Sequence, residues 1–117
     1  GGKMITLDYR DKRPIYEQII EGIQKLIISE VFKVDEKLPS VRSLAMEMSI
    51  NPNTIQRAYM QLEQEGWIYS VKGKGNFVSE KERWLSSKKK VALDTLCKEI
   101  EKAKELGVTK EEIINLL

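Results

Sequence analysis

The stretch NPNTIQRAYMQLEQEGW, residues 51–67, carries the clearest structural signal in this 117-residue sequence. Asn51 can cap a helix through its side-chain oxygen, and Pro52 suits the first helical position, where a missing N–H costs little. Apolar side chains then recur at i, i+3, i+4 and i+7, the spacing of one buried helix face: Ile55, Ala58, Tyr59 and Leu62. Gly66 is placed to end the helix in a left-handed conformation. The stretch therefore predicts an amphipathic helix that begins at Pro52 and ends before Gly66.

The opposite face of this predicted helix carries amide, hydroxyl and guanidinium groups, and no carboxylate occurs over residues 48–62. At about 100° per residue, Asn53 and Arg57 point away from the apolar face, one turn apart. Three further polar side chains flank them: Thr54, Gln56 and Gln61. Amides can pair with adenine, and arginine can pair with guanine or a phosphate oxygen, so we predict that this face binds double-stranded DNA. The alternative is an ordinary solvated helix face.

The residues before Asn51 predict a second, shorter helix followed by a turn. Ser40 is a good N-cap, and the buried side of the helix is formed by Leu44, Ala45 and Met48. Arg42 lies in the first turn, where free N–H groups and the helix dipole favour an anion such as a phosphate. Ser49-Ile50 then breaks the pattern. Two helices joined by a tight turn are therefore expected over residues 40–65.

The N-terminal part of the sequence predicts one longer helix and one short strand. Apolar residues recur every three or four positions from Tyr16 to Ile27, which predicts a helix over about residues 14–30 with Pro14 at its first position. Gly22 lowers the helix propensity of this segment by about 1 kcal/mol, which the apolar stripe should outweigh. Apolar and polar residues alternate over Ile5–Tyr9, the period of a half-buried strand.

A β-hairpin is expected after Gly66, with strands at Ile68–Val71 and Asn76–Ser79. The connecting residues are two lysines and two glycines: Lys72, Gly73, Lys74 and Gly75. Glycine allows the positive φ of a tight turn, and the lysines could approach a phosphate or a minor groove. Lysines at such a tip can also simply protect an exposed strand edge. The predicted fold class is mainly α with a small β-hairpin, a winged helix-turn-helix domain.

The composition changes near Ser79, and we place the domain boundary there: residues 1–79 as the winged helix-turn-helix and residues 80–117 as a helical region. A helix over about 82–106 should end at Gly107, and a capping box at Thr109 should begin a last short helix. One face of the long helix is apolar: Leu93, Leu96, Ile100 and Ala103. We predict that this face is buried in a homodimer; the alternative is that it folds back on the first domain.

Composition excludes several classes of function. Lys plus Arg is 20 and Asp plus Glu is 18, so the net charge is only +2 and DNA binding would need a local excess of basic residues. Residues 37–76 have such an excess, with five basic and three acidic side chains. No histidine is present and Cys97 is the only cysteine, so we expect no histidine-based catalysis, disulfide framework, metal or cofactor, and no enzymatic activity. No apolar run approaches the ~20 residues of a membrane span, and no signal peptide is evident, so a soluble cytoplasmic protein is expected.

Four stretches resemble the GntR family of bacterial transcription regulators, in order and with correct spacing. They are LPSVRSLA (residues 38–45), NPNTIQRAY (51–59), LEQEGWI (62–68) and GKGNFV (73–78), within a resemblance that covers residues 14–79. The start at Asn51, the arginine-alanine-tyrosine after Gln56 and the short tail resemble the YtrA subfamily. That resemblance implies a small dimeric regulator, commonly a repressor and often of a transporter operon. A tail of this length leaves no room for a ligand-binding domain of usual size. The sequence does not identify an effector.

The resemblance also implies roles for individual residues. Arg42 would anchor the DNA backbone, the wing at Gly73-Lys74-Gly75 would enter the minor groove, and four side chains would meet the major groove: Asn53, Thr54, Gln56 and Arg57. Ser40 and Lys72 complete the expected DNA-binding set. The sequence departs from larger relatives at Val41, where glutamate is usual, and at Pro52 and Gln56, where arginine is frequent. We therefore do not expect this chain to recognise guanine through positions 52 and 56, as relatives with arginine there would. The competing interpretation is a winged-helix module that binds only proteins.

Overall fold

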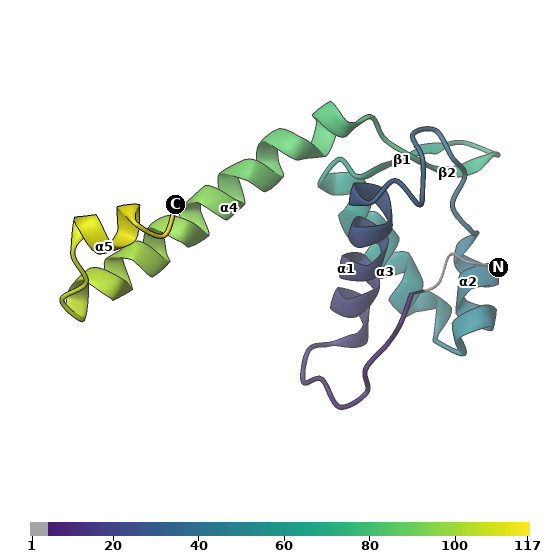
Figure 1. Cartoon of the computed structure of the whole chain (residues 1–117). Coiled ribbons are helices and arrows are strands. Elements are labelled where there is room, and N and C mark those ends of the chain that lie inside the picture. Colours follow the sequence, from purple (N-terminus) through teal and green to yellow (C-terminus); the bar gives the residue numbers. More distant parts are fainter. Residues whose placement is uncertain (1–4) are drawn as a thin grey trace. The chain divides into compact units, whose positions relative to one another are not determined.

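The computed structural model describes residues 5–117 of the chain (Figure 1). In chain order the elements are α1 (Ile15–Ile28), α2 (Val41–Met48), α3 (Pro52–Gln64), β1 (Ile68–Val71), β2 (Gly75–Val78), α4 (Lys81–Glu105) and α5 (Lys110–Ile114). This order confirms the predicted fold class, a winged helix-turn-helix followed by a long helix. The chain divides into two compact units, which we call the N-terminal unit, through Trp84, and the C-terminal unit, Leu85–Leu117. The domain boundary placed after residue 79 stays a prediction.

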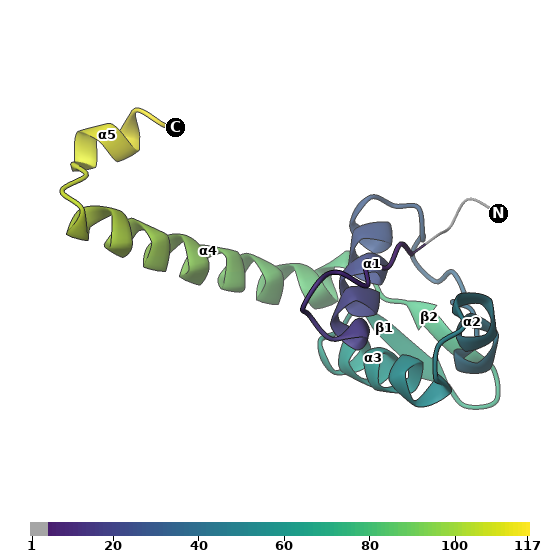
Figure 2. The same cartoon turned by 90° about the horizontal axis from the view of Figure 1, so that it is seen from below.

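In the N-terminal unit, α1 and α2 both pack on α3, as the two views of Figures 1 and 2 show. The largest fully buried apolar side chains come from α1, α3 and the hairpin: Ile19, Ile23, Ile55, Leu62, Ile68 and Val78. Since α3 is central to this core, its apolar face is fixed on the inside. Its polar face is therefore directed outward.

The caps predicted for α2 and α3 are confirmed. Ser40 Oγ accepts a hydrogen bond from the Ser43 N–H at 3.0 Å, and Asn51 Oδ1 accepts one from the Asn53 N–H at 2.8 Å. Between the helices, Ser49 adopts a left-handed conformation with φ of 56° and ends α2. These local bonds satisfy amides that a helix start leaves unpaired, so the turn between α2 and α3 is set by the sequence itself.

The strand predicted over Ile5–Tyr9 is wrong, because the structure gives residues 5–9 no strand pairing. The Asp8 N–H donates to Gln18 Oε1 at 2.9 Å, and Gln18 Nε2 donates back to the Asp8 carbonyl at 3.1 Å. A side-chain amide of α1 thus takes the place of a neighbouring strand. The alternation is real, with Ile5 and Leu7 partly buried and Thr6 exposed, but it reflects packing of this segment on helices rather than in a sheet.

Helix α1 begins one residue later than predicted, because Pro14 is its N-cap and not its first helical residue. Gly22 has a packing role within this helix. A Cβ at Gly22 would lie 2.6 Å from Ile5 Cγ2, so any other residue at position 22 would force the Ile5 side chain to shift. Gly22 therefore lowers the helix propensity of α1 but allows the Ile5 side chain to pack closely against this helix.

The hairpin has the predicted first strand, while its second strand begins and ends one residue earlier than predicted. Its register pairs Ile68 with Val78 and Val71 with Gly75. Gly66 ends the preceding helix segment with φ of 85°, as predicted, and a Cβ there would meet the Arg83 carbonyl oxygen at 2.7 Å. This close approach leaves room for no side chain at position 66.

The first turn of α4 packs within the N-terminal unit through a pair of indole rings. Trp84 stacks on Trp67 with ring centroids 4.4 Å apart and an angle of 11° between the planes. Both side chains are buried, and among residues 5–117 no acceptor pairs with the Trp84 indole N–H. Burial of the two aromatic rings stabilises the packing of the first turn of α4 within the N-terminal unit, despite the unsatisfied donor.

In the C-terminal unit, the predicted capping box at Thr109 is confirmed, and Gly107 has the expected positive φ of 86°. The predicted apolar face of α4 is largely open in the single chain. Leu93 and Leu96 are 61% and 54% exposed, whereas Ile100 and Ala103 are partly buried. Among the residues described, no helix combines the length and the apolar character of a membrane span.

Candidate nucleic-acid interface

The outward face of α3 has the orientation that the sequence predicted. Its apolar side chains are at most 2% exposed: Ile55, Ala58, Tyr59 and Leu62. Asn53, Gln56 and Arg57 are exposed, and Thr54 and Gln61 lie at the border. No acidic residue occupies the first turn of α3. This face therefore presents hydrogen-bonding groups and one positive charge, without a carboxylate that would repel a phosphate.

Arg57 does not extend freely from α3. Its guanidinium carbon lies 3.8 Å from the ring centroid of Tyr16, which belongs to α1. A cation over an aromatic face is attracted by the ring quadrupole, so Tyr16 restrains the direction of this guanidinium. Sequence reasoning placed Tyr16 in the apolar stripe of α1 and missed this contact. Spacing along one helix gives no signal for a partner on another helix.

Tyr59 holds α3 against the segment that leads into α2. Its hydroxyl donates to the Pro39 carbonyl at 2.7 Å, and burial raises the pKa of Tyr59 above its ordinary value. The hydroxyl therefore keeps its proton and remains a donor at physiological pH. This bond fixes Ser40 and the start of α2 relative to α3, which places the two predicted DNA-binding segments in one rigid unit.

The start of α2 is suited to an anion. Arg42 is exposed and the first turn of α2 contains no acidic residue. The Ser40 hydroxyl oxygen is used as the cap acceptor, so its own O–H remains available to donate to a ligand. Free amides, the helix dipole and Arg42 together favour a phosphate at this position.

The wing presents an exposed basic tip. Lys72, Gly73 and Lys74 are exposed, and a Cβ at Gly73 would meet nothing within 4 Å. Lys37 also lies here: its backbone bridges to Phe77, and its Cε would be 3.0 Å from a Cβ on Gly75. Sequence reasoning counted Lys37 only as local charge. Its place beside the wing follows from a bridge between distant residues, which no local pattern reveals.

The wing is attached to the end of α3 by a carboxylate. Glu63 accepts hydrogen bonds from both the backbone N–H and the hydroxyl of Ser70, the N–H bond measuring 3.0 Å. Glu63 is therefore engaged in positioning β1. The predicted DNA-binding residues are brought together by these contacts on α2, α3 and the wing, although their individual roles remain predictions.

A three-helix core with a short turn between α2 and α3, an outward helix face and a hairpin wing defines the winged helix-turn-helix class of transcription regulators. Residues 15–78 match the family model described as "Bacterial regulatory proteins, gntR family". The chain belongs to the GntR family, and the resemblance stated from its motifs is confirmed. Membership in this family makes it a regulator and not an enzyme.

Two curated relatives come from Bacillus subtilis (strain 168). The HTH-type transcriptional repressor YtrA is 47% identical over 77 residues, which cover 66% of this chain and 59% of that protein. The uncharacterised HTH-type transcriptional regulator YhcF is 36% identical over 107 residues, covering 91% of this chain and 88% of that protein. The chain thus spans less than two thirds of the first relative and most of the second.

Solved structures show the same architecture. A GntR family transcriptional regulator from Listeria monocytogenes has a TM-score of 0.74 and 37% identity, covering 94% of this chain and 96% of that one. The DNA-binding domain of AraR, solved in complex with an operator, has a TM-score of 0.56 and 31% identity, covering 63% of this chain and 89% of that one. A structural relative of the N-terminal unit has therefore been seen on DNA.

Proposed function

We propose that this chain is a sequence-specific DNA-binding repressor that acts as a homodimer on a bacterial operator in the cytoplasm. The outward face of α3 carries the proposal, because it combines exposed Asn53, Gln56 and Arg57 with the absence of acidic residues in its first turn. The AraR domain on its operator supports DNA as the partner. Similarity to the repressor YtrA supports repression, and the resemblance of the sequence motifs to the YtrA subfamily extends the proposal to a transporter operon.

The proposed contacts divide into two kinds. Arg42, the Ser40 hydroxyl and the wing lysines Lys72 and Lys74 would bind phosphates, which position the protein without reading sequence. Side chains of α3 would read base edges in the major groove: Asn53, Thr54, Gln56 and Arg57. Glycines 73 and 75 would let the wing backbone approach the minor groove.

A homodimer is proposed because one helix-turn-helix unit makes few contacts. Two recognition helices would need to lie about 34–36 Å apart, one turn of DNA, or a multiple of that distance. Exposed Leu93 and Leu96, with partly buried Ile100 and Ala103, provide an apolar face on α4 for a second copy. Burial of that face would remove apolar surface from water in the dimer.

The central test is the Arg57→Ala variant. Duplexes bound by the wild-type protein are first selected from a random pool, and affinity for the selected duplex is then measured by fluorescence anisotropy. We expect Arg57→Ala to weaken binding by about 1–3 kcal/mol and to relax preference at one position of each half-site. Arg10→Ala, a matched loss of an exposed arginine outside the proposed face, should leave affinity unchanged.

Two results would contradict parts of this proposal. A folded Arg57→Ala variant that binds as tightly and as selectively as the wild type would remove Arg57 from the reading face. Failure of the wild-type protein to bind any duplex, even at low salt, would favour the alternative of a module that binds only proteins, because phosphate contacts should be strongest at low salt.

A further inference from the structure

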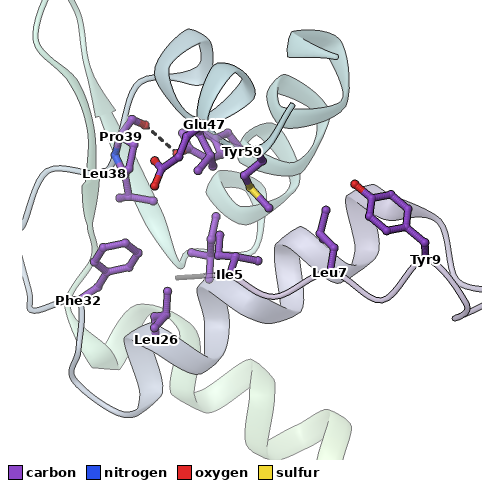
Figure 3. Close-up of a pocket in the computed structure, with 12 residues that line it drawn as sticks. Ile5, Leu7, Tyr9, Leu26, Phe32, Leu38, Pro39, Glu47 and Tyr59 are labelled. Atoms are coloured by element: carbon purple, nitrogen blue, oxygen red, sulfur yellow. Dashed lines mark hydrogen bonds between the residues drawn. The ribbon is translucent and has the colours of Figure 1, made fainter. Parts of the chain in front are cut away.

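The N-terminal unit contains a cavity of about 300 Å³ (Figure 3). It is lined by side chains of the N-terminal segment, α1, the loop before α2, α2 and α3, including Ile5, Leu7, Leu26, Phe32 and Leu38. This volume is at the lower end of the range for small-molecule sites, which are mostly apolar and carry a few polar groups. The cavity is therefore large enough for a compact organic molecule.

The polar groups of this cavity are few. Tyr59 also lines it, but its hydroxyl is already bonded to the Pro39 carbonyl, as the dashed line in Figure 3 shows. Glu47 of α2 is the one charged residue among the described residues that line the cavity. Glu47 is exposed to solvent, and its carboxylate lies at the edge of the cavity. Within residues 5–117, no hydrogen bond or ion pair engages this carboxylate.

This combination selects the chemistry of a ligand. Glu47 is exposed, so its carboxylate stays hydrated at the edge of the cavity, where it repels an anion, attracts a cation and adds nothing to the affinity for a neutral molecule. A cation with an apolar body satisfies both parts of the lining, because its charge pairs with Glu47 and its hydrocarbon is buried against the aliphatic and aromatic walls. Charge complementarity thus favours an amphipathic cation.

We propose that this cavity is a binding site for a small organic cation, an ammonium group carried on a compact aliphatic or aromatic body, with the ammonium on Glu47. The site is separate from the outward face of α3 and does not depend on the proposed DNA binding. It touches both helices of the helix-turn-helix, through Leu44 and Glu47 of α2 and Tyr59 of α3. A ligand there would contact the elements that hold the DNA-facing residues in place.

The test uses the full chain and three probes with the same phenylpropyl skeleton: cationic 3-phenylpropylammonium, neutral 3-phenylpropan-1-ol and anionic 3-phenylpropanoate. Methyl NMR spectra of the protein are recorded while each probe is added. We expect the cation to shift the methyl resonances of Ile5, Leu7, Leu26 and Leu44, and to bind up to about fivefold more tightly than the anion, since an exposed ion pair contributes about 0.2–1 kcal/mol.

Two substitutions separate the contribution of the Glu47 charge to binding from the contribution of the cavity volume. Glu47 is exposed enough for Glu47→Gln to fold, and this variant should bind the cation about two- to fivefold more weakly while its affinity for the neutral alcohol stays unchanged. Glu17→Gln, the same change at an exposed position outside the cavity, should alter neither affinity. Leu26→Phe, which reduces the cavity volume, should weaken the binding of both the cation and the neutral alcohol.

The proposal is overturned if the cation shifts only resonances outside the cavity, if Glu47→Gln and Glu17→Gln bind the cation equally, or if the anion binds as tightly as the cation. Thermal melting of each variant shows that it is folded before binding is compared. Since the measurements contain no DNA, their outcome is independent of whether the chain is a repressor.

Discussion

Tyr16 and Arg57 show at the scale of single residues how two helices cooperate in the proposed interface. The guanidinium of Arg57 rests on the Tyr16 ring instead of moving freely in solvent. Restraining a long side chain before binding reduces the conformational entropy lost when it meets DNA. Tyr16 is therefore expected to support the affinity of Arg57 without itself needing to contact a base.

This role of Tyr16 predicts a graded mutational effect. Tyr16→Leu keeps an apolar side chain on α1 but removes the aromatic face, and we expect operator binding to weaken by about 0.5–1 kcal/mol, the value of an exposed cation–π contact. Tyr16→Phe keeps the ring face and should restore most of the affinity. Fluorescence anisotropy with the selected duplex measures both variants.

A double-substitution cycle provides the control for that prediction. If Tyr16 acts through Arg57, then Tyr16→Leu should have little further effect in the Arg57→Ala background. Equal losses from Tyr16→Leu in both backgrounds would show that Tyr16 contributes independently of the arginine.

The sequence was informative about residues whose partners are local and uninformative about residues whose partners are distant. Ser40 and Asn51 cap helices through amides two or three residues away, so their roles could be predicted from short patterns. The Tyr16–Arg57 stack and the position of Lys37 beside the wing join residues about forty positions apart in the chain. Helix periodicity showed that Arg57 points outward, but periodicity contains no information about which neighbour it meets.

At the scale of elements, the N-terminal segment shows why an alternating pattern is ambiguous. Alternation of apolar and polar residues reports that one side of an extended segment is buried, and it does not report what forms the hydrogen bonds. Here Gln18 supplies those bonds and Gly22 provides the space for Ile5. Helices with 3.6-residue periodicity were predicted within one or two residues at most ends, since their hydrogen bonds are internal.

Salt bridges of Arg13 with Asp11 and Glu21, and of Lys25 with Glu21, predict a pH dependence of stability. A side-chain hydrogen bond from Arg13 lowers the pKa of Asp11, and hydrogen bonds from Lys25 and then Arg13 lower the pKa of Glu21. A carboxyl group with a lowered folded-state pKa stabilises the fold fully above its unfolded pKa of about 4, and this contribution is lost as the pH falls through the folded value.

We therefore expect protonation of Asp11 and Glu21 to contribute to a fall in the melting temperature below about pH 4. The double variant Asp11→Asn, Glu21→Gln should show a shallower fall, and thermal melts at pH 6 and pH 3 measure the difference. The same pH dependence in variant and wild type would show that these exposed bridges contribute nothing measurable, as many surface ion pairs do.

The wing makes a separate prediction about salt. Lys74 lies at an open glycine-containing tip, so we expect Lys74→Ala to weaken binding to all duplexes similarly and to reduce the slope of log affinity against log salt by about 1. Lys110→Ala on α5 removes an exposed lysine outside the proposed interface and should leave the slope unchanged. An unchanged slope for Lys74→Ala would exclude this lysine from the phosphate contacts.

At the scale of the whole molecule, the apolar face of α4 determines the expected oligomeric state. Leu93 and Leu96 would be unusual as a pair of leucines left in water on a helix that is otherwise strongly charged. We expect the wild-type chain to sediment at about twice its monomer mass of 13.5 kDa. Operator binding should then depend on protein concentration near the dimer dissociation constant.

Leu96→Asp tests this expectation, because a buried aspartate at the interface would lack a partner. Analytical ultracentrifugation should show the variant as a monomer, with weaker operator binding. Met46→Asp places the same charge at an exposed apolar position of α2 and should remain dimeric. A wild-type chain that sediments as a monomer at every concentration would refute the homodimer.

The stacked indoles of Trp67 and Trp84 have a practical consequence. They are the two tryptophans of the sequence, and both are buried within the N-terminal unit. Intrinsic tryptophan emission therefore reports on that unit alone, while the C-terminal unit is spectroscopically silent at the same wavelengths. Comparing emission with far-ultraviolet circular dichroism during denaturation would reveal whether the two units melt together or one after the other.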